Sequence, residues 1–318
     1  MKAFKFVLKC ILALLPILAV VIYTAVVPYG YMDTEYPSWK YTKDFNAPVE
    51  NIILGDSRAM ADLIPSNFDT QTVNLAVGGA TSIEMYYTLN TYIKNNGCPK
   101  NVIIMFAPFH YTIIDNFWTR TAYFNYLSIS DMSELYSYAE ATESETLLRK
   151  GYKNDLLSYR LRFPDKYLPA LINSKLIGRY SENKTQYDKV ASSLGYGEFG
   201  TADGSSDLNY ESTYEEMHKT KDAVLLDIYL NKLLTLCEDN GINTILTIPP
   251  MNHSSYVELN PSYTDDLYYY LEGLKAKHKA VKIDSTIPEY DDIYFGDASH
   301  LNNKGAIKFT EEFIKNTK

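Results

Sequence analysis

The chain has 318 residues, of which 46% are hydrophobic, and this is enough for one large α/β domain or two small ones. Its 39 acidic residues outnumber its 30 basic ones and give a formal net charge of −9, so we expect no nucleic-acid partner. The three cysteines, Cys10, Cys98 and Cys237, are too few and too scattered for a disulfide framework or a zinc site.

Residues 1–30 form a predicted cytoplasmic tip and transmembrane segment. Lys2, Lys5 and Lys9 precede an uncharged run from Cys10 to Val27, which just reaches the length needed to cross a bilayer. Positive charge before the run places the N-terminus in the cytoplasm. A cleaved signal peptide and a buried core helix are the alternatives, but signal peptides have shorter apolar cores and a small-residue cleavage site. We therefore expect an uncleaved, single-pass anchor in the cell membrane, with the remaining chain on the extracytoplasmic side.

After a proline-containing stalk at 31–48, residues 49–318 alternate between strand and helix patterns. Strands are predicted at 49–56, 72–79, 100–108, 242–250 and 280–286, and helices at 82–96, 223–241, 262–279 and 303–318. This alternation implies right-handed crossovers and a mostly parallel sheet covered on both faces, a three-layer α/β/α fold. Ligands bind such sheets at the carboxyl ends of the strands.

Residues 111–217 interrupt the alternation and are rich in Tyr, Ser and Asp. A segment of this length is too long for a bare loop. We interpret it as an insertion in the domain that lies over the strand ends, as a lid or as a platform for a partner or substrate.

The first motif is the turn that ends the strand "NIILGDSRA" with Gly55, Asp56, Ser57 and Arg58. One interpretation is purely structural, with glycine at the bend and Asp56 or Ser57 as the helix N-cap. The other is a serine nucleophile at the carboxyl end of a strand. The sequence of this turn alone is compatible with both.

The second motif is "YFGDASHLNNKGA", which places Asp297 three residues before His300 and ahead of the last helix. At this spacing the carboxylate can reach Nδ1 of the imidazole, fix its tautomer and leave Nε2 to accept a hydroxyl proton. The alternative is a capping aspartate with a nearby surface histidine. Because Ser57 lies at another strand end of the same predicted sheet, the catalytic interpretation is favoured.

Taken together, "LGDSRA", "NLAVGGAT" and "GDASHLNNKGA" resemble the SGNH (GDSL-type) hydrolase superfamily, whose fold is flavodoxin-like. The resemblance implies that Ser57 is the nucleophile, His300 the general base and Asp297 the residue that orients it. It also implies an oxyanion hole formed by the backbone N–H of Ser57, a backbone N–H of Gly78 or Gly79, and an asparagine side chain. No GxND block supplies that asparagine here, although His110 and Asn116 lie in the corresponding region.

Arg58, the membrane anchor and the missing asparagine block together resemble a subset of the superfamily that acylates exported polysaccharides. The resemblance implies an O-acyltransferase that receives an acyl group, expected to be acetyl, from a multi-pass membrane acyltransferase and passes it to a cell-surface polysaccharide. It implies no cofactor and no metal, and it makes Arg58 a candidate for substrate binding. A surface ion pair of Arg58 with Asp62 is the alternative for that residue. Two other functions stay open, an extracellular carbohydrate esterase or deacetylase and an inactive scaffold that binds glycan or an acyltransferase.

Overall fold

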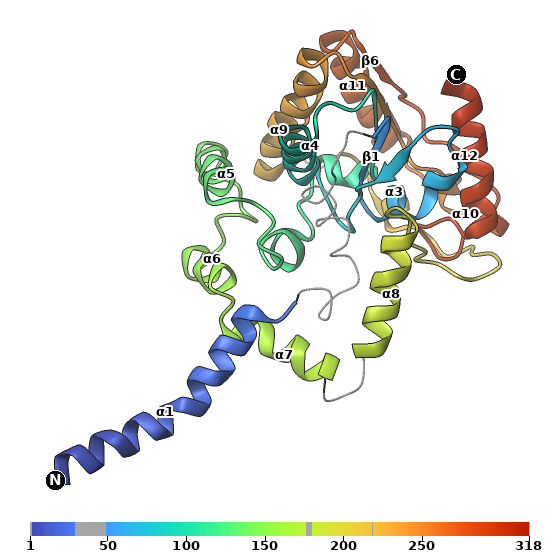
Figure 1. Cartoon of the computed structure of the whole chain (residues 1–318). Coiled ribbons are helices and arrows are strands. Elements are labelled where there is room, and N and C mark those ends of the chain that lie inside the picture. The colour runs from blue at the N-terminus through green and yellow to red at the C-terminus, as the bar shows by residue number, and fades with distance from the viewer. Residues whose placement is uncertain (1, 29–48, 176–179, 218, 318) are drawn as a thin grey trace.

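The computed structural model describes residues 2–28, 49–175, 180–217 and 219–317, so the predicted stalk at 31–48 lies outside the described residues. Helix α1 (Lys2–Val26) projects from the rest of the protein (Figure 1). It is long and apolar enough to cross a membrane, and most of its side chains are exposed rather than packed against the domain. These properties support the predicted membrane anchoring.

The central sheet has five parallel strands in the order β2-β1-β3-β4-β6. These strands are β1 (Asn51–Gly55), β2 (Thr72–Asn74), β3 (Asn101–Met105), β4 (Asn243–Thr247) and β6 (Val281–Ile283). Numbered along the chain, they have the flavodoxin-like order 2-1-3-4-5. The predicted α/β class and mostly parallel sheet are therefore confirmed.

Helices cover both faces of this sheet, as the run of β-branched and aliphatic residues in its strands predicts. Ile52 and Leu54 pack toward α4 (Ser82–Asn96), α9 (Lys221–Asp239) and α11 (Pro261–Lys277). Ile53 lies between them in sequence and packs on the opposite face, toward α3 (Ser57–Asp62) and α12 (Asn303–Thr317). This alternation buries β1 on both sides and fixes the direction in which its carboxyl end presents Ser57.

Several short elements complete the domain. They are η2 (Pro65–Asn67), η3 (Pro108–Tyr111), η4 (Phe117–Thr121), η5 (Tyr210–Thr213), α10 (His253–Tyr256), η6 (Asp292–Tyr294), and the small parallel pair β5 (Met251–Asn252) and β7 (Glu289–Tyr290). An isolated antiparallel bridge between Phe295 and Leu301 closes the loop that carries Asp297 and His300.

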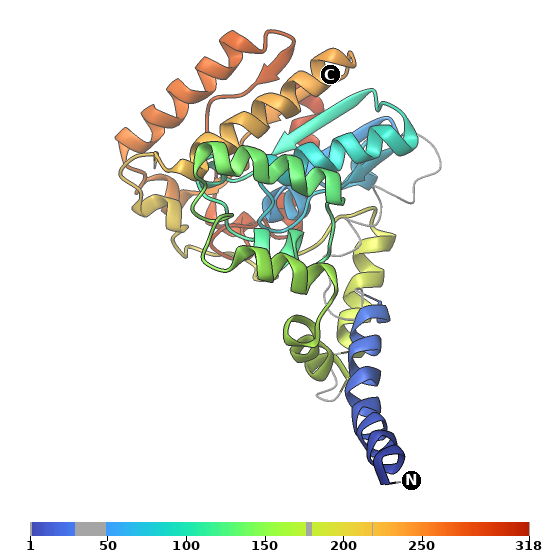
Figure 2. The ribbon, with the colours of Figure 1, turned by 90° about the vertical axis from the view of Figure 1, so that its left-hand side faces the viewer.

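The insertion at 111–217 contains α5 (Ile129–Thr142), α6 (Tyr152–Arg160), α7 (Pro164–Lys175) and α8 (Tyr180–Ser192). Helix α5 packs against α9 on the outside of the domain, and α7 runs beside the C-terminal end of α1 (Figures 1 and 2). Two parts of the insertion lie near the strand ends: Asn116, before α5, lies against Gly79, which follows β2, and the segment after α8 contacts His300 and Arg58. The insertion therefore approaches the strand ends through these two segments, whereas α5 to α7 lie elsewhere.

Candidate active site

In the turn after β1, only glycine fits at position 55, two residues before Ser57. A side chain at Gly55 would place its Cβ 1.8 Å from the backbone oxygen of Met105 on the neighbouring strand. Asp56 then caps α3, because its Oδ1 accepts a hydrogen bond from the N–H of Arg58 at 2.9 Å. The structural interpretation of this turn is therefore correct, and it does not exclude the catalytic one, since capping by Asp56 leaves the Ser57 hydroxyl unused.

The structure brings Ser57, His300 and Asp297 together as the sequence predicts. Nε2 of His300 lies 2.8 Å from Oγ of Ser57, although the two residues are 243 positions apart. Nδ1 of His300 lies 2.9 Å from Oδ2 and 3.0 Å from Oδ1 of Asp297. With Nδ1 donating to the carboxylate, Nε2 is left as the acceptor for the serine proton.

Asp297 is held in its charged form by its surroundings. Partial burial alone would raise its pKa, but hydrogen bonds and charge attraction from His300, with hydrogen bonds from the backbone N–H groups of Ser299 and His300, lower the pKa to about 2. The same backbone bonds fix the carboxylate in the loop. Asp297 is therefore a preformed negative partner for an imidazolium at His300.

We predict that Asp297→Asn changes stability in a pH-dependent way. The pKa of this carboxyl falls from 3.8 to about 2 on folding, so the charged form stabilises the folded chain above pH 3.8 and this contribution is lost as the pH falls toward 2. The wild type should have the higher melting temperature at pH 7, and the difference should shrink between pH 4 and 2. Thermal unfolding across this range measures it, and a difference that persists unchanged at pH 2 would contradict the prediction.

A buried carboxyl group joins the two halves of the site. Asp62, at the end of α3, is fully buried, and its Oδ1 accepts a hydrogen bond at 3.0 Å from the N–H of Leu301, the residue after His300. Burial raises the pKa of Asp62 well above its usual range. The backbone oxygen of Asp62 also accepts from the hydroxyl of Thr310 in α12. The helix that starts with Ser57 is thus tied directly to the loop that carries His300.

Arg58 lies in the interior instead of on the surface. It is 3% exposed, and its guanidinium forms an ion pair at 2.8 Å with Glu211 from the insertion, whose side chain is 0% exposed. Burial alone would lower the pKa of Arg58, but Glu211 raises it above its usual value. The alternative of a surface pair with Asp62 is wrong, because Asp62 is buried as well. Substrate binding by Arg58 stays a prediction, and the contacts present are those of a residue that holds α3 to the insertion.

A second buried pair lies in the turn that carries Ser57. Oδ2 of Asp56 accepts hydrogen bonds from the N–H of Ala107 at 2.8 Å and lies 2.9 Å from Nδ1 of His110. Burial opposes ionisation of Asp56, but these partners and Arg58 lower its pKa overall. His110 therefore stabilises the turn through Asp56, and the residue is only 2% exposed.

The insertion also contacts the imidazole itself. The ring of Phe199 stacks on His300 with centroids 4.8 Å apart and planes 19° apart. The next residue, Gly200, lies so close to the loop that carries His300 that a Cβ on it would be 2.4 Å from the carbonyl carbon of Gly296. The insertion therefore forms one wall of the site.

We predict that Gly296→Ala disturbs this wall. The added Cβ would lie 2.2 Å from the backbone of Gly200, so one of the two segments has to move. We expect a loss of about 1–3 kcal/mol in the free energy of unfolding and slower esterase turnover, because Asp297 follows directly. Gly273→Ala is the control, since nothing lies within 4 Å of that position in α11. Wild-type stability and turnover in Gly296→Ala would show that the contact is unimportant.

The predicted oxyanion glycines follow β2 near the same edge of the sheet. Within the described part of the chain, no acceptor is bound by the backbone N–H groups of Gly78 and Gly79. Gly79 adopts φ +68°, and a Cβ there would overlap Nδ2 of Asn116 at 2.0 Å. Of the two residues considered for the missing asparagine, Asn116 therefore lies against Gly79, while His110 is engaged by Asp56.

The sequence analysis identified Ser57 and His300, together with the neighbouring carboxyl groups of Asp56 and Asp297. It missed Glu211, Phe199 and the role of Asp62. The segment "SRAMAD" offered one signal, because Arg58 and Asp62 flank three apolar residues in a short helix, and charged residues in such a setting predict buried partners. Among the described residues, no three His, Cys, Asp or Glu side chains are grouped so that they could hold a metal ion.

Comparison with protein families shows a similarity over the C-terminal part of the chain. Residues 229–316 match the family model of the DltD protein, an SGNH-like protein of D-alanine transfer in teichoic acid biosynthesis. This match covers α9 onward and so includes Asp297 and His300 but not Ser57. No curated protein matches the chain. The chain is thus similar, over its C-terminal part, to a family of membrane-anchored extracytoplasmic proteins that modify cell-wall polymers.

Proposed function

We propose that this chain is a serine-dependent O-acyltransferase that works on the extracytoplasmic side of the membrane and acylates a cell-surface polysaccharide. The observation that carries the proposal is the continuous hydrogen-bonded chain from Ser57 through His300 to Asp297. The membrane-type helix α1 and the similarity to the DltD family support a place at the cell surface. The acyl donor is proposed to be a multi-pass membrane acyltransferase.

The proposed reaction has two steps. Oγ of Ser57 attacks the carbonyl carbon of the donor while its proton passes to Nε2 of His300, which then protonates the leaving group and leaves an acyl-serine. A sugar hydroxyl next gives its proton to the same nitrogen, attacks the ester and restores Ser57. Asp297 stabilises the imidazolium in both steps. If water replaces the sugar hydroxyl, the enzyme is the alternative esterase.

The test is to give the full-length protein 4-nitrophenyl acetate and an oligosaccharide with free hydroxyls. The proposal predicts acetylated oligosaccharide by mass spectrometry, and it predicts that Ser57→Ala forms none. Free acetate without acetylated sugar would favour the esterase. Absence of any acyl-serine on a folded protein would favour the inactive scaffold.

We further predict that Asn116 supplies the third oxyanion donor. Its amide lies beside Gly79 and is held by Asp115 and Thr119. Asn116→Ala should lower kcat by about 10²–10³-fold with little change in KM, because the donor acts only in the transition state. Steady-state kinetics with 4-nitrophenyl acetate measure this. Asn243→Ala, at the amino end of β4 and so at the opposite edge of the sheet, is the control, and an equal kcat in Asn116→Ala and wild type would refute the role.

A further inference from the structure

Residues 149–175, which include α6, α7 and the three residues before α6, are called the foot. The foot is attached to the end of the membrane helix α1. Nη1 and Nη2 of Arg162 donate to the backbone oxygens of Ala25 at 3.2 Å and Val27 at 2.6 Å. These carbonyls belong to the last turn of α1 and to the residue that follows it, where a helix end leaves such groups without partners. Val27 is only 4% exposed and packs against Tyr167 and Leu171 of α7.

These contacts fix the height of the foot relative to the bilayer. The apolar helix that is long enough to span a membrane ends at Val26, and Pro28 follows, so we take this point as the place where the chain leaves the apolar layer. Both ribbon views place α7 beside this end of α1 (Figures 1 and 2). The foot therefore lies at the level of the membrane–water interface.

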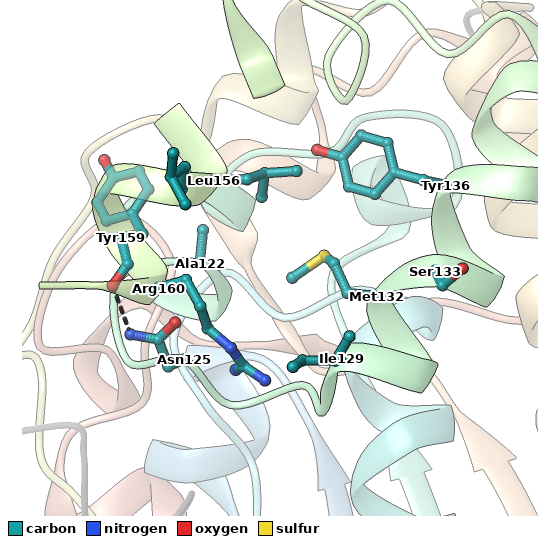
Figure 3. Close-up of a pocket in the computed structure, with 10 residues that line it drawn as sticks. Ala122, Asn125, Ile129, Met132, Ser133, Tyr136, Leu156, Tyr159 and Arg160 are labelled. Carbon is teal, nitrogen blue, oxygen red and sulfur yellow. Dashed lines mark hydrogen bonds between the residues drawn. The ribbon is translucent and has the colours of Figure 1, made fainter. Parts of the chain in front are cut away.

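The foot exposes apolar side chains at the level of the membrane–water interface. Leu157 is 56% exposed, Leu161 51%, Phe163 38% and Ile172 39%. A pocket of about 430 Å³ between α5 and α6 continues the surface, and Figure 3 shows Ile129, Met132 and Leu156 among its lining residues. Ile129 at the edge of this pocket is 73% exposed. Apolar side chains gathered in this way mark an interaction surface.

The charge of the foot differs in sign from that of the whole chain. Although the protein has a formal charge of −9, the basic residues of segment 149–166 clearly outnumber its acidic residues, with Arg149, Lys150, Lys153, Arg160, Arg162 and Lys166 against Asp155 and Asp165. Basic residues beside exposed apolar ones are the combination that holds peripheral helices in an anionic lipid interface.

We propose that the foot lies in the lipid interface of the same membrane that α1 spans. Leu157, Leu161 and Phe163 enter the apolar boundary, the exposed edge of the pocket faces lipid, and the lysines contact anionic headgroups. A single membrane helix would leave the domain free to tilt, whereas a second contact fixes its orientation. The insertion thus sets the direction in which Ser57 faces above the membrane, whatever reaction the site catalyses.

The test is to measure the depth of a nitroxide label in the full-length chain in vesicles of phosphatidylglycerol and phosphatidylcholine. Cys10→Ser and Cys98→Ser remove the exposed thiols, and Cys237 is buried. Leu157→Cys carries the label in one variant. Tyr269→Cys carries it in the control, because Tyr269 is 71% exposed on α11. The proposal predicts that the label at 157 collides several-fold more with lipid-soluble oxygen than with a water-soluble nickel chelate, and that the label at 269 does the reverse.

The basic residues are tested by Lys150→Glu combined with Lys153→Glu. These changes should reduce the immersion of the label at 157 in vesicles rich in phosphatidylglycerol and leave it unchanged in pure phosphatidylcholine. Equal access of the nickel chelate to positions 157 and 269 in a folded protein would overturn the proposal and favour a protein partner for this surface. Circular dichroism confirms folding of each variant.

Discussion

Replacing Ser57 with alanine is expected to abolish ester turnover while leaving the fold intact. The only hydrogen bond of the Ser57 hydroxyl in the described structure joins it to Nε2 of His300, and α3 is capped by Asp56 instead. With the nucleophile removed, no acyl-serine can form, and losses of about 10⁴-fold or more in turnover are typical of such changes. Release of 4-nitrophenol from 4-nitrophenyl acetate measures the rate.

Two further variants make this prediction specific. His300→Ala should be as inactive as Ser57→Ala, and the double variant should be no worse, because the two residues act as a unit. Ser299→Ala is the matched control, since Ser299 contributes its backbone N–H to Asp297 and keeps it as alanine. Appreciable turnover in a folded Ser57→Ala protein would mean that the chemistry lies elsewhere.

Replacing Glu211 with glutamine is expected to cause the largest loss of stability. This carboxylate is paired with Arg58 at 2.8 Å in a buried setting, and its other oxygen accepts from the N–H of Phe109 at 2.9 Å. Glutamine keeps the shape but removes the negative charge that is paired directly with the guanidinium of Arg58. Breaking a buried pair from one side costs about 3–5 kcal/mol. Urea unfolding of the detergent-solubilised chain, followed by circular dichroism, measures the change.

The double variant Arg58→Met/Glu211→Leu separates the net contribution of the ion pair to stability from the cost of leaving one of its charges buried and unpaired. Because replacing both partners of a buried ion pair with apolar residues is often neutral, this variant should be much more stable than Glu211→Gln. Asp188→Asn is the control, since its pair with Lys184 is exposed, and it should lose less than about 1 kcal/mol. A loss equally small in Glu211→Gln would show that the buried charges are not coupled.

The elements that the sequence predicted well are those whose signals are local. Helix α4 occupies Ser82–Asn96 as predicted, because Thr81 and Glu84 form a capping box at its start and Gly97 follows its end. The buried strands were recognised by their apolar runs, although β2 is limited to Thr72–Asn74. The meeting of Ser57 with His300 could be predicted because both motifs follow elements of one parallel sheet.

The contacts that escaped prediction join segments with no common pattern. The partners of Arg58 and His300 in the insertion, Glu211 and Phe199, are brought to them only by the path of the chain after α8. Nothing in the composition of 111–217 distinguishes these two residues from their neighbours. In the same way, Asp62 looked like the partner of Arg58 because of helical spacing, whereas burial directs it to Leu301.

The most direct measurement of the central claim is labelling of the full-length protein with a fluorophosphonate, followed by peptide mass spectrometry. We predict that the adduct is found on Ser57, that Asp297→Asn slows its formation and that His300→Ala prevents it. A folded protein that takes up no label, or takes it up on another serine, would contradict the proposed nucleophile and the function built on it.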